Sequence, residues 1–235
     1  MLTDMADHPP AFWVEPGLAQ HLVCGTAHAV TQALQTGCDP RWVHRSSGMI
    51  LRPEFYVPSR SDRAVDRRRV GLDDATPKGL VLFGGTGSRV MKRIAQRLAH
   101  TPLILLCGRK SALADELRAP PATGAPRVMV GHTPAVARWM QLADFFVGKP
   151  GPGSLSEAVQ QGLPVIVTRN AWTMPQERWN TERVQQHGLG LVHRSFRHVR
   201  SAVDRLTPHL PDFQAWVRQM KTARSSSCRA SCNAS

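Results

Sequence analysis

The sequence predicts an α/β fold built on a parallel, doubly wound sheet. Over residues 78–206, short apolar runs alternate with amphipathic helical segments, which is the pattern of consecutive β-α-β units. Glycine-rich turns follow several of the apolar runs, at the strand ends where such sheets bind ligands. Hydrophobic residues make up 42% of the 235 residues, which is sufficient for a buried core.

Six strands are expected in this region because each apolar run is short and is bounded by turn residues. The run Leu80–Phe83 comes first and has the composition of a fully buried strand. The other expected strands cover residues 103–107, 127–130, 145–147, 165–168 and 189–192.

Helices are expected between these strands and after the last one. Val90, Ile94 and Leu98 share one face of the first helix. Thr133 and Pro134 form a typical N-cap and first-turn pair for a later helix. The expected helices cover residues 90–100, 133–142, 154–161, 175–187 and 213–220.

The rest of the chain divides by composition into three further parts. Residues 1–56 have a mixed α/β pattern, in which Thr26 is placed to cap a helix. Residues 57–77 are polar and rich in Arg and Asp, which indicates a linker or, alternatively, a surface loop within one domain. Residues 221–235 are small, polar and aperiodic, so we expect a disordered tail. In the first part we expect strands over 21–24 and 43–47 and a helix over 27–36.

The charge of the chain favours an anionic partner. The formal net charge is +13, from 30 basic and 17 acidic residues, although codon bias can also enrich arginine. The basic residues are dispersed and no nucleic-acid-binding signature is present, so we expect no nucleic acid partner. The five cysteines are too few for a disulfide framework, which favours a reducing cytoplasm, and no zinc spacing is present. We expect no signal peptide and no membrane-spanning segment.

The first motif is Phe83-Gly-Gly-Thr-Gly-Ser88, between an expected strand and an expected helix. Glycines allow the backbone to approach a phosphate closely, and the following helix N-terminus offers free N–H groups. A tight turn that binds no ligand remains the alternative interpretation.

The second motif, Gly148–Ala158, again joins a strand to a helix and contains three further glycines and two prolines. Lys149 is a candidate counter-charge for a phosphate. The spacing of Ser154 and Glu157 predicts a capping box, which leaves the preceding Lys-Pro-Gly-Pro-Gly unexplained. A carboxylate in the first helical turn is also placed to accept hydrogen bonds from ribose hydroxyls.

The third motif, Met174–Asn180, follows the fifth expected strand. Pro175 is expected to begin a helix whose first exposed turn carries Gln176 and Glu177. An amide and a carboxylate suit the vicinal hydroxyls of a sugar, although the helix dipole alone also favours acidic residues there.

The order and placement of these motifs resemble the C-terminal, donor-binding domain of family 28 glycosyltransferases. The stretch 143–158, then Gly162–Ile166, then Pro175–Glu177 with Asn180 is especially similar to the monogalactosyldiacylglycerol synthase and diacylglycerol glucosyltransferase branch. The resemblance covers about residues 78–206. Residues 1–56 resemble the end of that family's N-terminal domain, so we expect a remnant of it before a domain over 78–220.

The resemblance implies a GT-B fold, a UDP-sugar donor, inverting transfer of a hexose to a lipid acceptor, and neither a metal nor a cofactor. By matched position, Glu157 would bind the ribose, Gln176 and Glu177 the sugar, and the segment around His132 the uracil. Both glycine loops would hold the pyrophosphate. The residues assigned to the donor are Gly84, Gly85, Thr86, Gly87, Ser88, His132, Lys149, Gly151, Gly153, Ser154, Glu157, Gln176, Glu177 and Asn180.

The catalytic base is unknown, because only the end of an N-terminal domain is expected in this chain. Asp4 and His8 are the weak candidates that the chain offers. The alternative to an active enzyme is a truncated, inactive UDP-sugar-binding module, or one half of a split enzyme completed by a separate chain. A lipid acceptor and the positive charge predict peripheral association with an anionic surface, the inner face of the cell membrane. We also expect the protein to be bacterial.

Overall fold

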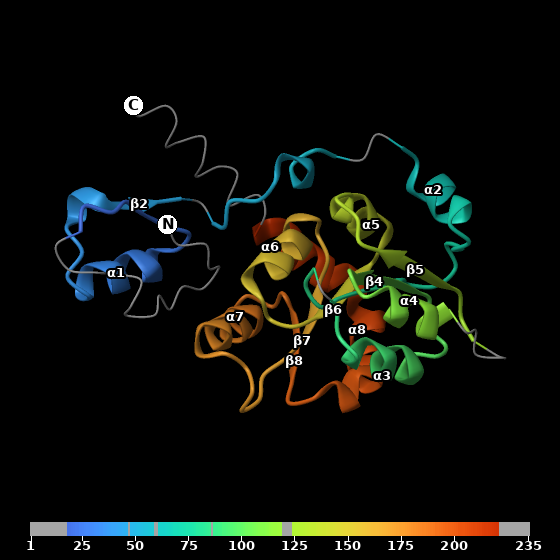
Figure 1. Ribbon diagram of the computed structural model, residues 1–235. Helices are drawn as coiled ribbons and strands as arrows, with labels where there is room; N and C mark the ends of the chain where they lie inside the picture. The colour runs from blue at the N-terminus through green and yellow to red at the C-terminus, as the bar shows by residue number, and fades with distance from the viewer. Residues whose placement is uncertain (1–17, 47, 59–60, 86, 119–123, 221–235) are drawn as a thin grey trace.

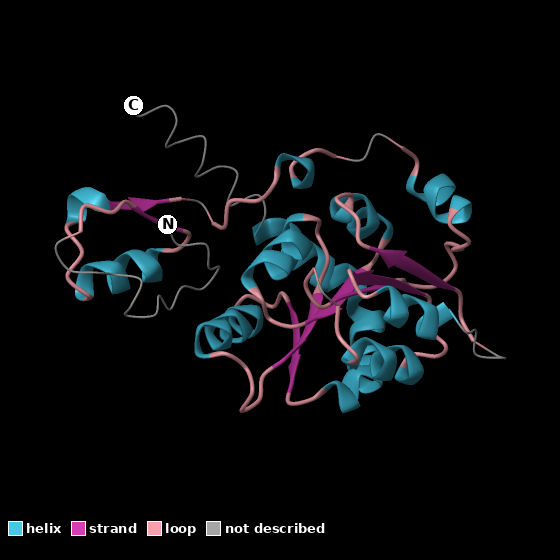
Figure 2. Ribbon diagram, viewed as in Figure 1, coloured by secondary structure: helices cyan, strands magenta, loops and turns pink. Residues whose placement is uncertain are grey.

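The computed structural model describes residues 18–46, 48–58, 61–85, 87–118 and 124–220. A small N-terminal unit precedes a larger domain in which helices cover both faces of a central sheet (Figures 1 and 2). The candidate bases Asp4 and His8, and the expected tail over 221–235, lie outside the described residues.

The larger domain contains a six-stranded sheet, and all of its strand pairs are parallel. The strand order is β5-β4-β3-β6-β7-β8, so the chain moves outward from β3 in one direction and then from β6 in the other. The six expected strands are confirmed to within two residues at their ends. They are β3 (Gly79–Leu82), β4 (Leu103–Gly108), β5 (Arg127–Gly131), β6 (Phe145–Gly148), β7 (Val165–Thr168) and β8 (Gly190–His193).

The central strands are apolar throughout because helices cover the sheet on both sides. Leu80 and Leu82 point into one hydrophobic cluster, and Val81 points into the other. Helices α5 and α6 supply buried side chains to the first cluster, and α3, α4 and α8 supply them to the second. The predicted α/β, doubly wound architecture is therefore confirmed. The helices are α3 (Val90–Arg97), α4 (Ser111–Arg118), α5 (Val136–Leu142), α6 (Pro152–Gln160), α7 (Pro175–Gln186) and α8 (Val199–Leu206), with a last helix over 210–220.

Several helix boundaries differ from the sequence expectation. Helix α5 begins at Val136 rather than at residue 133, because the hydroxyl of Thr133 accepts a hydrogen bond from the amide of Ala135 in a preceding turn (3.1 Å). Helices α4 and α8 are not predicted from the pattern, although Leu113 and Leu117 bury one face of α4. Short 3-10 helices also occur at Pro40–Trp42, Pro53–Phe55, Phe196–His198 and Thr207–His209.

The N-terminal unit has the predicted strand-helix-strand order. Strand β1 (Leu22–Cys24) pairs in parallel with β2 (Val43–Arg45), and α1 (Ala27–Gln35) connects them. The hydroxyl of Thr26 caps α1 by accepting a hydrogen bond from the amide of Ala29 (3.1 Å). Residues 22–45 therefore form a single β-α-β unit.

Residues 48–58 and 61–77 contact the larger domain at several points. Phe55 is 1% exposed and belongs to the same cluster as the sheet. Helix α2 (Arg63–Arg69) lies within the segment expected as a linker. The buried Arg67 of α2 donates to the carbonyl of Leu142 (2.9 Å) and to the carboxylate of Asp144 (2.8 Å). In the described ranges, no helix is long and apolar enough to span a membrane.

Candidate functional site

The sheet has a topological switch point between β3 and β6. These neighbouring strands send their following loops to opposite sides, which opens a crevice at their carboxyl ends. The loop after β3 contains the first predicted motif, and the loop after β6 contains the second. The fold therefore brings together two glycine-rich loops that are more than sixty residues apart in the sequence.

A cavity of about 510 Å³ occupies this crevice. Backbone from both glycine loops, the turn after β5 and the first two turns of α6 line it. Of the residues predicted to bind the donor, the following line this cavity: Gly84, Gly85, His132, Lys149, Gly151, Gly153, Ser154 and Glu157.

The first glycine loop packs tightly against the end of β4. Gly87 has φ of +66°, and a Cβ there would lie 2.3 Å from the carbonyl oxygen of Cys107. Gly108 has φ of +62°, and a Cβ there would lie 2.3 Å from the carbonyl oxygen of Gly85. These two glycines are required by the fold itself. A Cβ at Gly85, in contrast, would meet nothing within 4 Å, so its backbone is open on the cavity side.

Of the donor residues assigned in the first motif, Gly87 and Ser88 are described but do not line the cavity. The hydroxyl of Ser88 accepts a hydrogen bond from the amide of Val90 (3.3 Å), at the start of α3. Ser88 therefore has a local structural role, because its hydroxyl stabilises the start of α3. Thr86 lies outside the described residues.

The predicted capping box at the start of α6 is wrong. The helix begins at Pro152, so Ser154 lies in its first turn and Glu157 in its second. Pro152 suits the first helical position because its fixed φ is helical and it has no N–H to satisfy. The amides of Gly153 and Ser154 therefore have no carbonyl acceptor within the helix, and they lie at the positive end of its dipole on the cavity wall.

Glu157 projects from the second turn of α6 and is half-buried. The pKa of its carboxyl group is raised to about 7, chiefly by burial; the guanidinium of Arg52 acts to lower this pKa, and the nearby Glu54 acts to raise it. The carboxyl group therefore changes its charge near neutral pH. Because it lies on the cavity wall, this carboxyl group can form hydrogen bonds with polar atoms of a ligand.

The third motif contacts the second glycine loop. Lys149 Nζ lies 3.1 Å from Glu177 Oε1, and the Glu177 side chain is 9% exposed whereas that of Lys149 is 48% exposed. Asn180 is fully buried, and its Nδ2 donates to the carbonyl of Pro150 (2.8 Å). Asn180 thus anchors the second glycine loop to α7. The side chain of Gln176 lies outside the described part of the structure.

Sequence reasoning missed Arg52, which lines the cavity from outside the sheet domain. Its Nη1 donates to the carbonyl of Pro134 (3.1 Å), in the turn after β5. The available signal is the apolar character of the segment, in which Leu51 and Phe55 flank Arg52, because it indicates that this segment packs against a core.

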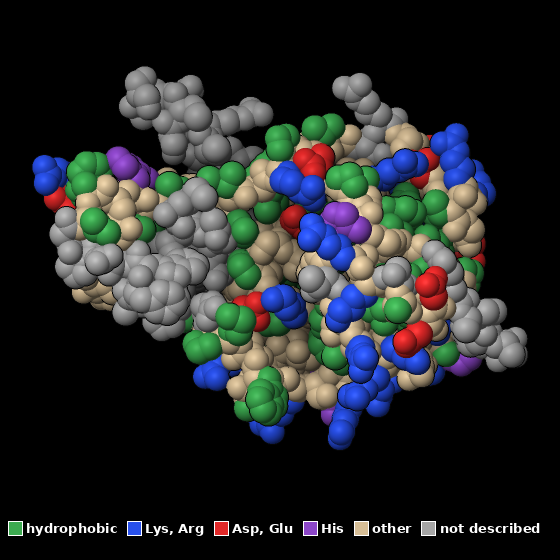
Figure 3. Space-filling view, in the orientation of Figure 1, with side chains coloured by type: hydrophobic (Ala, Val, Ile, Leu, Met, Phe, Trp, Pro, Cys, Tyr) green, Lys and Arg blue, Asp and Glu red, His purple; other side chains and the backbone are tan. Residues whose placement is uncertain are grey.

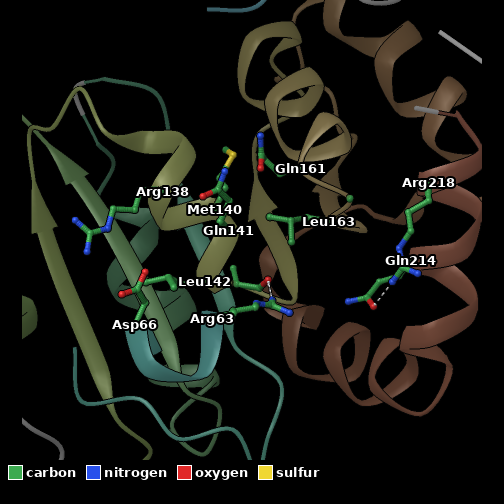
Figure 4. Close-up of a pocket in the computed structure, with 12 residues that line it drawn as sticks. Arg63, Asp66, Arg138, Met140, Gln141, Leu142, Gln161, Leu163, Gln214 and Arg218 are labelled. Atoms are coloured by element: carbon green, nitrogen blue, oxygen red, sulfur yellow. Dashed lines mark hydrogen bonds between the residues drawn. The ribbon is translucent and has the colours of Figure 1, made fainter. Parts of the chain in front are cut away.

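A second cavity, of about 320 Å³, lies at the opposite edge of the sheet (Figure 4). It is bordered by the residues that precede β6 and β7, and its polar groups are used inside the protein. Arg63 bonds to Asp144 (2.9 Å), and Gln161 donates to the carbonyl of Phe55 (2.8 Å). Gln214 donates to the carbonyl of Asp144 (3.3 Å). This cavity lies away from the glycine loops, and its contacts hold Phe55 and Arg63 on the domain.

Comparison with known proteins supports the resemblance inferred from the motifs. No protein-family model matches the sequence. A probable monogalactosyldiacylglycerol synthase 2 of rice is 25% identical over 228 residues, covering 92% of this chain and 47% of the relative. Monogalactosyldiacylglycerol synthase 3 of Arabidopsis thaliana is 28% identical over 194 residues, covering 78% and 40%. The chain thus spans less than half the length of these relatives.

Solved structures show the same fold at lower identity. Anabaena HepE, solved with UDP and glucose, has a TM-score of 0.58 at 12% identity and matches 88% of this chain and 59% of its own. Acinetobacter baumannii MurG has a TM-score of 0.52 at 14% identity, with 84% and 65% covered. The chain is thus a relative of the monogalactosyldiacylglycerol synthases, and its sheet domain has the fold of GT-B glycosyltransferases.

Proposed function

We propose that this chain is the donor-binding part of a UDP-sugar glycosyltransferase that transfers a hexose to a lipid acceptor. The observation that carries the proposal is the cavity at the switch point, which both glycine loops and the N-terminus of α6 line. The names of the relatives, and the UDP bound to a structural neighbour, support the same donor class.

The diphosphate would lie between the two loops. The open backbone at Gly85 and the free amides of Gly153 and Ser154 offer hydrogen-bond donors there. Lys149 adds a positive charge at the rim. When the glycosidic bond of the donor breaks, negative charge develops on the UDP leaving group, and these fixed donors would stabilise it without a metal.

The nucleoside would lie toward β5, and the sugar toward α7. Glu157 would accept hydrogen bonds from the ribose hydroxyls, and the turn around His132 would border the uracil. At the other end, Glu177 lies against Lys149. If Lys149 turns toward the phosphates, Glu177 becomes available to the hydroxyls of the hexose. Asn180 would act as a positioning residue, because its amide supports the loop at Pro150.

Inverting transfer requires a base that deprotonates the acceptor as it attacks the anomeric carbon. The candidates Asp4 and His8 are outside the described residues, so the base is left unassigned. A second candidate function is a donor-binding module without transfer activity of its own, because the cavity that carries the proposal is lined by residues assigned to the donor.

We also propose peripheral association with an anionic membrane, where a lipid acceptor resides. The net charge is +13, and Figure 3 shows Lys and Arg side chains spread over the viewed face rather than gathered in one patch. Each basic residue near an anionic surface contributes about 1 kcal/mol. The fraction of protein that co-sediments with phosphatidylglycerol vesicles should therefore fall as the salt concentration rises. Binding that is independent of both salt concentration and lipid charge would contradict this account.

Calorimetric titration with UDP, UDP-glucose, UDP-galactose and ADP tests the donor class directly. We expect the uridine nucleotides to bind and ADP to bind at least tenfold more weakly. Incubation of the chain with radiolabelled UDP-hexoses and a lipid extract then separates the two candidate functions. Labelled glycolipid supports an active enzyme, whereas nucleotide binding without product supports the binding module.

A further inference from the structure

The loop between β7 and α7, over residues 169–174, carries the most exposed large hydrophobic side chain among the described residues. Trp172 is 94% exposed, and Met174 is 49% exposed. Apolar surface in contact with water is unfavourable, and a tryptophan ring gains free energy when it moves into an apolar or interfacial environment. Trp172 does not line the donor cavity, so the exposure of its ring is not explained by donor binding.

Hydrogen bonds fix the backbone that presents Trp172. The amide of Trp172 donates to Asn170 Oδ1 (2.9 Å), and the amide of Asn170 donates to the hydroxyl of Thr173 (2.9 Å). Asn170 Nδ2 also donates to the carbonyl of Arg194 (3.2 Å), which joins this loop to the segment after β8. Arg178 Nε donates to the carbonyl of Thr173 (3.2 Å) from the first turns of α7. The loop is therefore preorganised, with the indole ring left on the surface.

The surroundings of Trp172 are basic. Residues 169–178 and 194–200 together contain five arginines and one acidic residue, Glu177, which is buried. An exposed aromatic ring among cationic side chains complements an anionic lipid surface, because the ring suits the headgroup layer and the cations suit the lipid phosphates. The arginines of these segments that are exposed are Arg178, Arg194, Arg197 and Arg200.

The loop begins at the same edge of the sheet as the donor cavity. Strand β7 lies beside β6, whose following loop lines the cavity. The β7–α7 loop and the segment after β8 reach the lower margin of the sheet domain in Figure 1, where Figure 3 shows hydrophobic and basic side chains together. Positive charge is spread over the molecule, so charge alone does not select the face that meets a membrane. The exposed ring of Trp172 does select one.

We propose that the β7–α7 loop docks this chain on an anionic membrane, with the ring of Trp172 inserted among the lipid headgroups and the surrounding arginines against the lipid phosphates. This proposal rests on the proposed function, because a lipid acceptor requires the carboxyl edge of the sheet to face the bilayer. Insertion of the ring is largely independent of salt, whereas the contribution of the arginines is screened by it.

The test is co-sedimentation of the full chain with vesicles made of equal parts of phosphatidylglycerol and phosphatidylcholine, at low and at high salt. W172A should lower the partition coefficient about tenfold at both salt concentrations. W172F should retain most of the binding, because its ring can still insert. R194A/R197A should lower binding about tenfold at low salt and much less at high salt. The carbonyl of Arg194 that holds the loop remains in this variant.

Two matched controls lie away from the loop. W216A removes a tryptophan that is 46% exposed and packs over Gly188, at the opposite edge of the sheet. R68A/R218A removes the same charge as R194A/R197A from exposed positions on α2 and the last helix. Each control should change vesicle binding by less than about twofold, because neither alters the proposed contact face. All variants are compared below their thermal midpoints, and W172A should match wild type in thermal midpoint because its side chain is exposed.

Calorimetric titration with UDP, without vesicles, separates this inference from the proposed function. W172A should bind UDP as wild type does. If the chain binds vesicles through Trp172 and does not bind UDP, the proposed function fails and the docking surface stands. If wild type does not bind the anionic vesicles, or if W172A and W216A lose equal amounts of binding, the docking surface is wrong. Unchanged vesicle binding in W172A, with self-association that W172A loses in analytical ultracentrifugation, would assign the loop to a second copy of the chain and overturn the proposal.

Discussion

The two edges of the sheet use similar polar residues for different purposes. At the amino edge, where the strands of the sheet begin, Asp144 accepts hydrogen bonds from Arg67, Arg63 and the amide of Lys78 at 2.8–2.9 Å. These charged groups hold helix α2 and the preceding segment on the domain. At the carboxyl edge, backbone donors are open, and Glu157 is half-buried beside a cavity. Charged groups that are hydrogen-bonded to other protein groups stabilise the fold. Polar groups that face a cavity are available to bind a ligand.

Asp144 is the centre of the hydrogen-bond network at the edge where the strands begin. Asp144→Ala should lower the free energy of unfolding by about 3 kcal/mol, because it leaves the buried guanidinium of Arg67 with the half-exposed Asp74 as its remaining ionic partner. Chemical denaturation measures the change. The exposed ion pair of Asp204 with Arg200 (3.8 Å) provides the control, and Asp204→Ala should cost under about 0.5 kcal/mol. Equal effects of the two variants would contradict the structural role.

At the carboxyl edge, the largest effect should fall on ligand binding. Glu157→Ala should weaken UDP binding by about 1–3 kcal/mol, the scale of losing a charged hydrogen-bond partner. Glu157→Gln keeps the shape of the side chain and should lose less. Titration calorimetry measures both, and Glu116→Ala, at an exposed pair with Lys92, is the control. If UDP affinity is unchanged in Glu157→Ala, this carboxylate does not bind the nucleotide.

The pH dependence of Glu157 should have opposite signs for stability and for binding. Its folded pKa of about 7 lies above the ordinary value of 4.5, so the folded state holds the proton more tightly. This contribution to stability is complete below about pH 4.5 and is lost as the pH rises to about 7. UDP affinity should instead rise between about pH 6 and 8, as the carboxylate forms. Denaturation and titration across this range check both trends, and Glu157→Gln should flatten them.

The smallest expected effect concerns the sugar end of the cavity. Gln176→Ala and Glu177→Ala should each reduce the preference for UDP-hexose over UDP by about 0.5–1.5 kcal/mol and leave UDP binding nearly intact. Glu182→Ala, on the same helix and paired with Arg169 (2.7 Å), is the control. Equal losses for both ligands would place these residues at the nucleotide instead of the sugar.

The local pattern of the sequence was sufficient to predict the strands and the two glycine loops. Short apolar runs bounded by turn residues predicted all six strands of the sheet within two residues at their ends. Thr26 was likewise correctly identified as a helix cap. These features depend on neighbours a few residues away, so the chain encodes them locally.

Where a helix begins proved harder to predict, because competing local signals are close in strength. Ser154 and Glu157 have the spacing of a capping box, yet α6 begins at Pro152. The fixed φ of the proline and the extended backbone of Gly151 (φ of −67°, ψ of 138°) decide the boundary. A shift of two residues moves Glu157 into the second turn and turns the amides of Gly153 and Ser154 into open donors.

The sequence by itself determined the α/β class, the strands, the glycine loops and eight of the residues that line the cavity. Only the tertiary structure decided that the loops after β3 and β6 lie side by side, that Asp144 gathers Arg63 and Arg67, and that Arg52 enters the cavity. The physical reason is the distance along the chain over which each signal acts. Periodicity and turn chemistry act over a few residues, whereas strand order and side-chain partners depend on packing between segments that lie far apart in the chain.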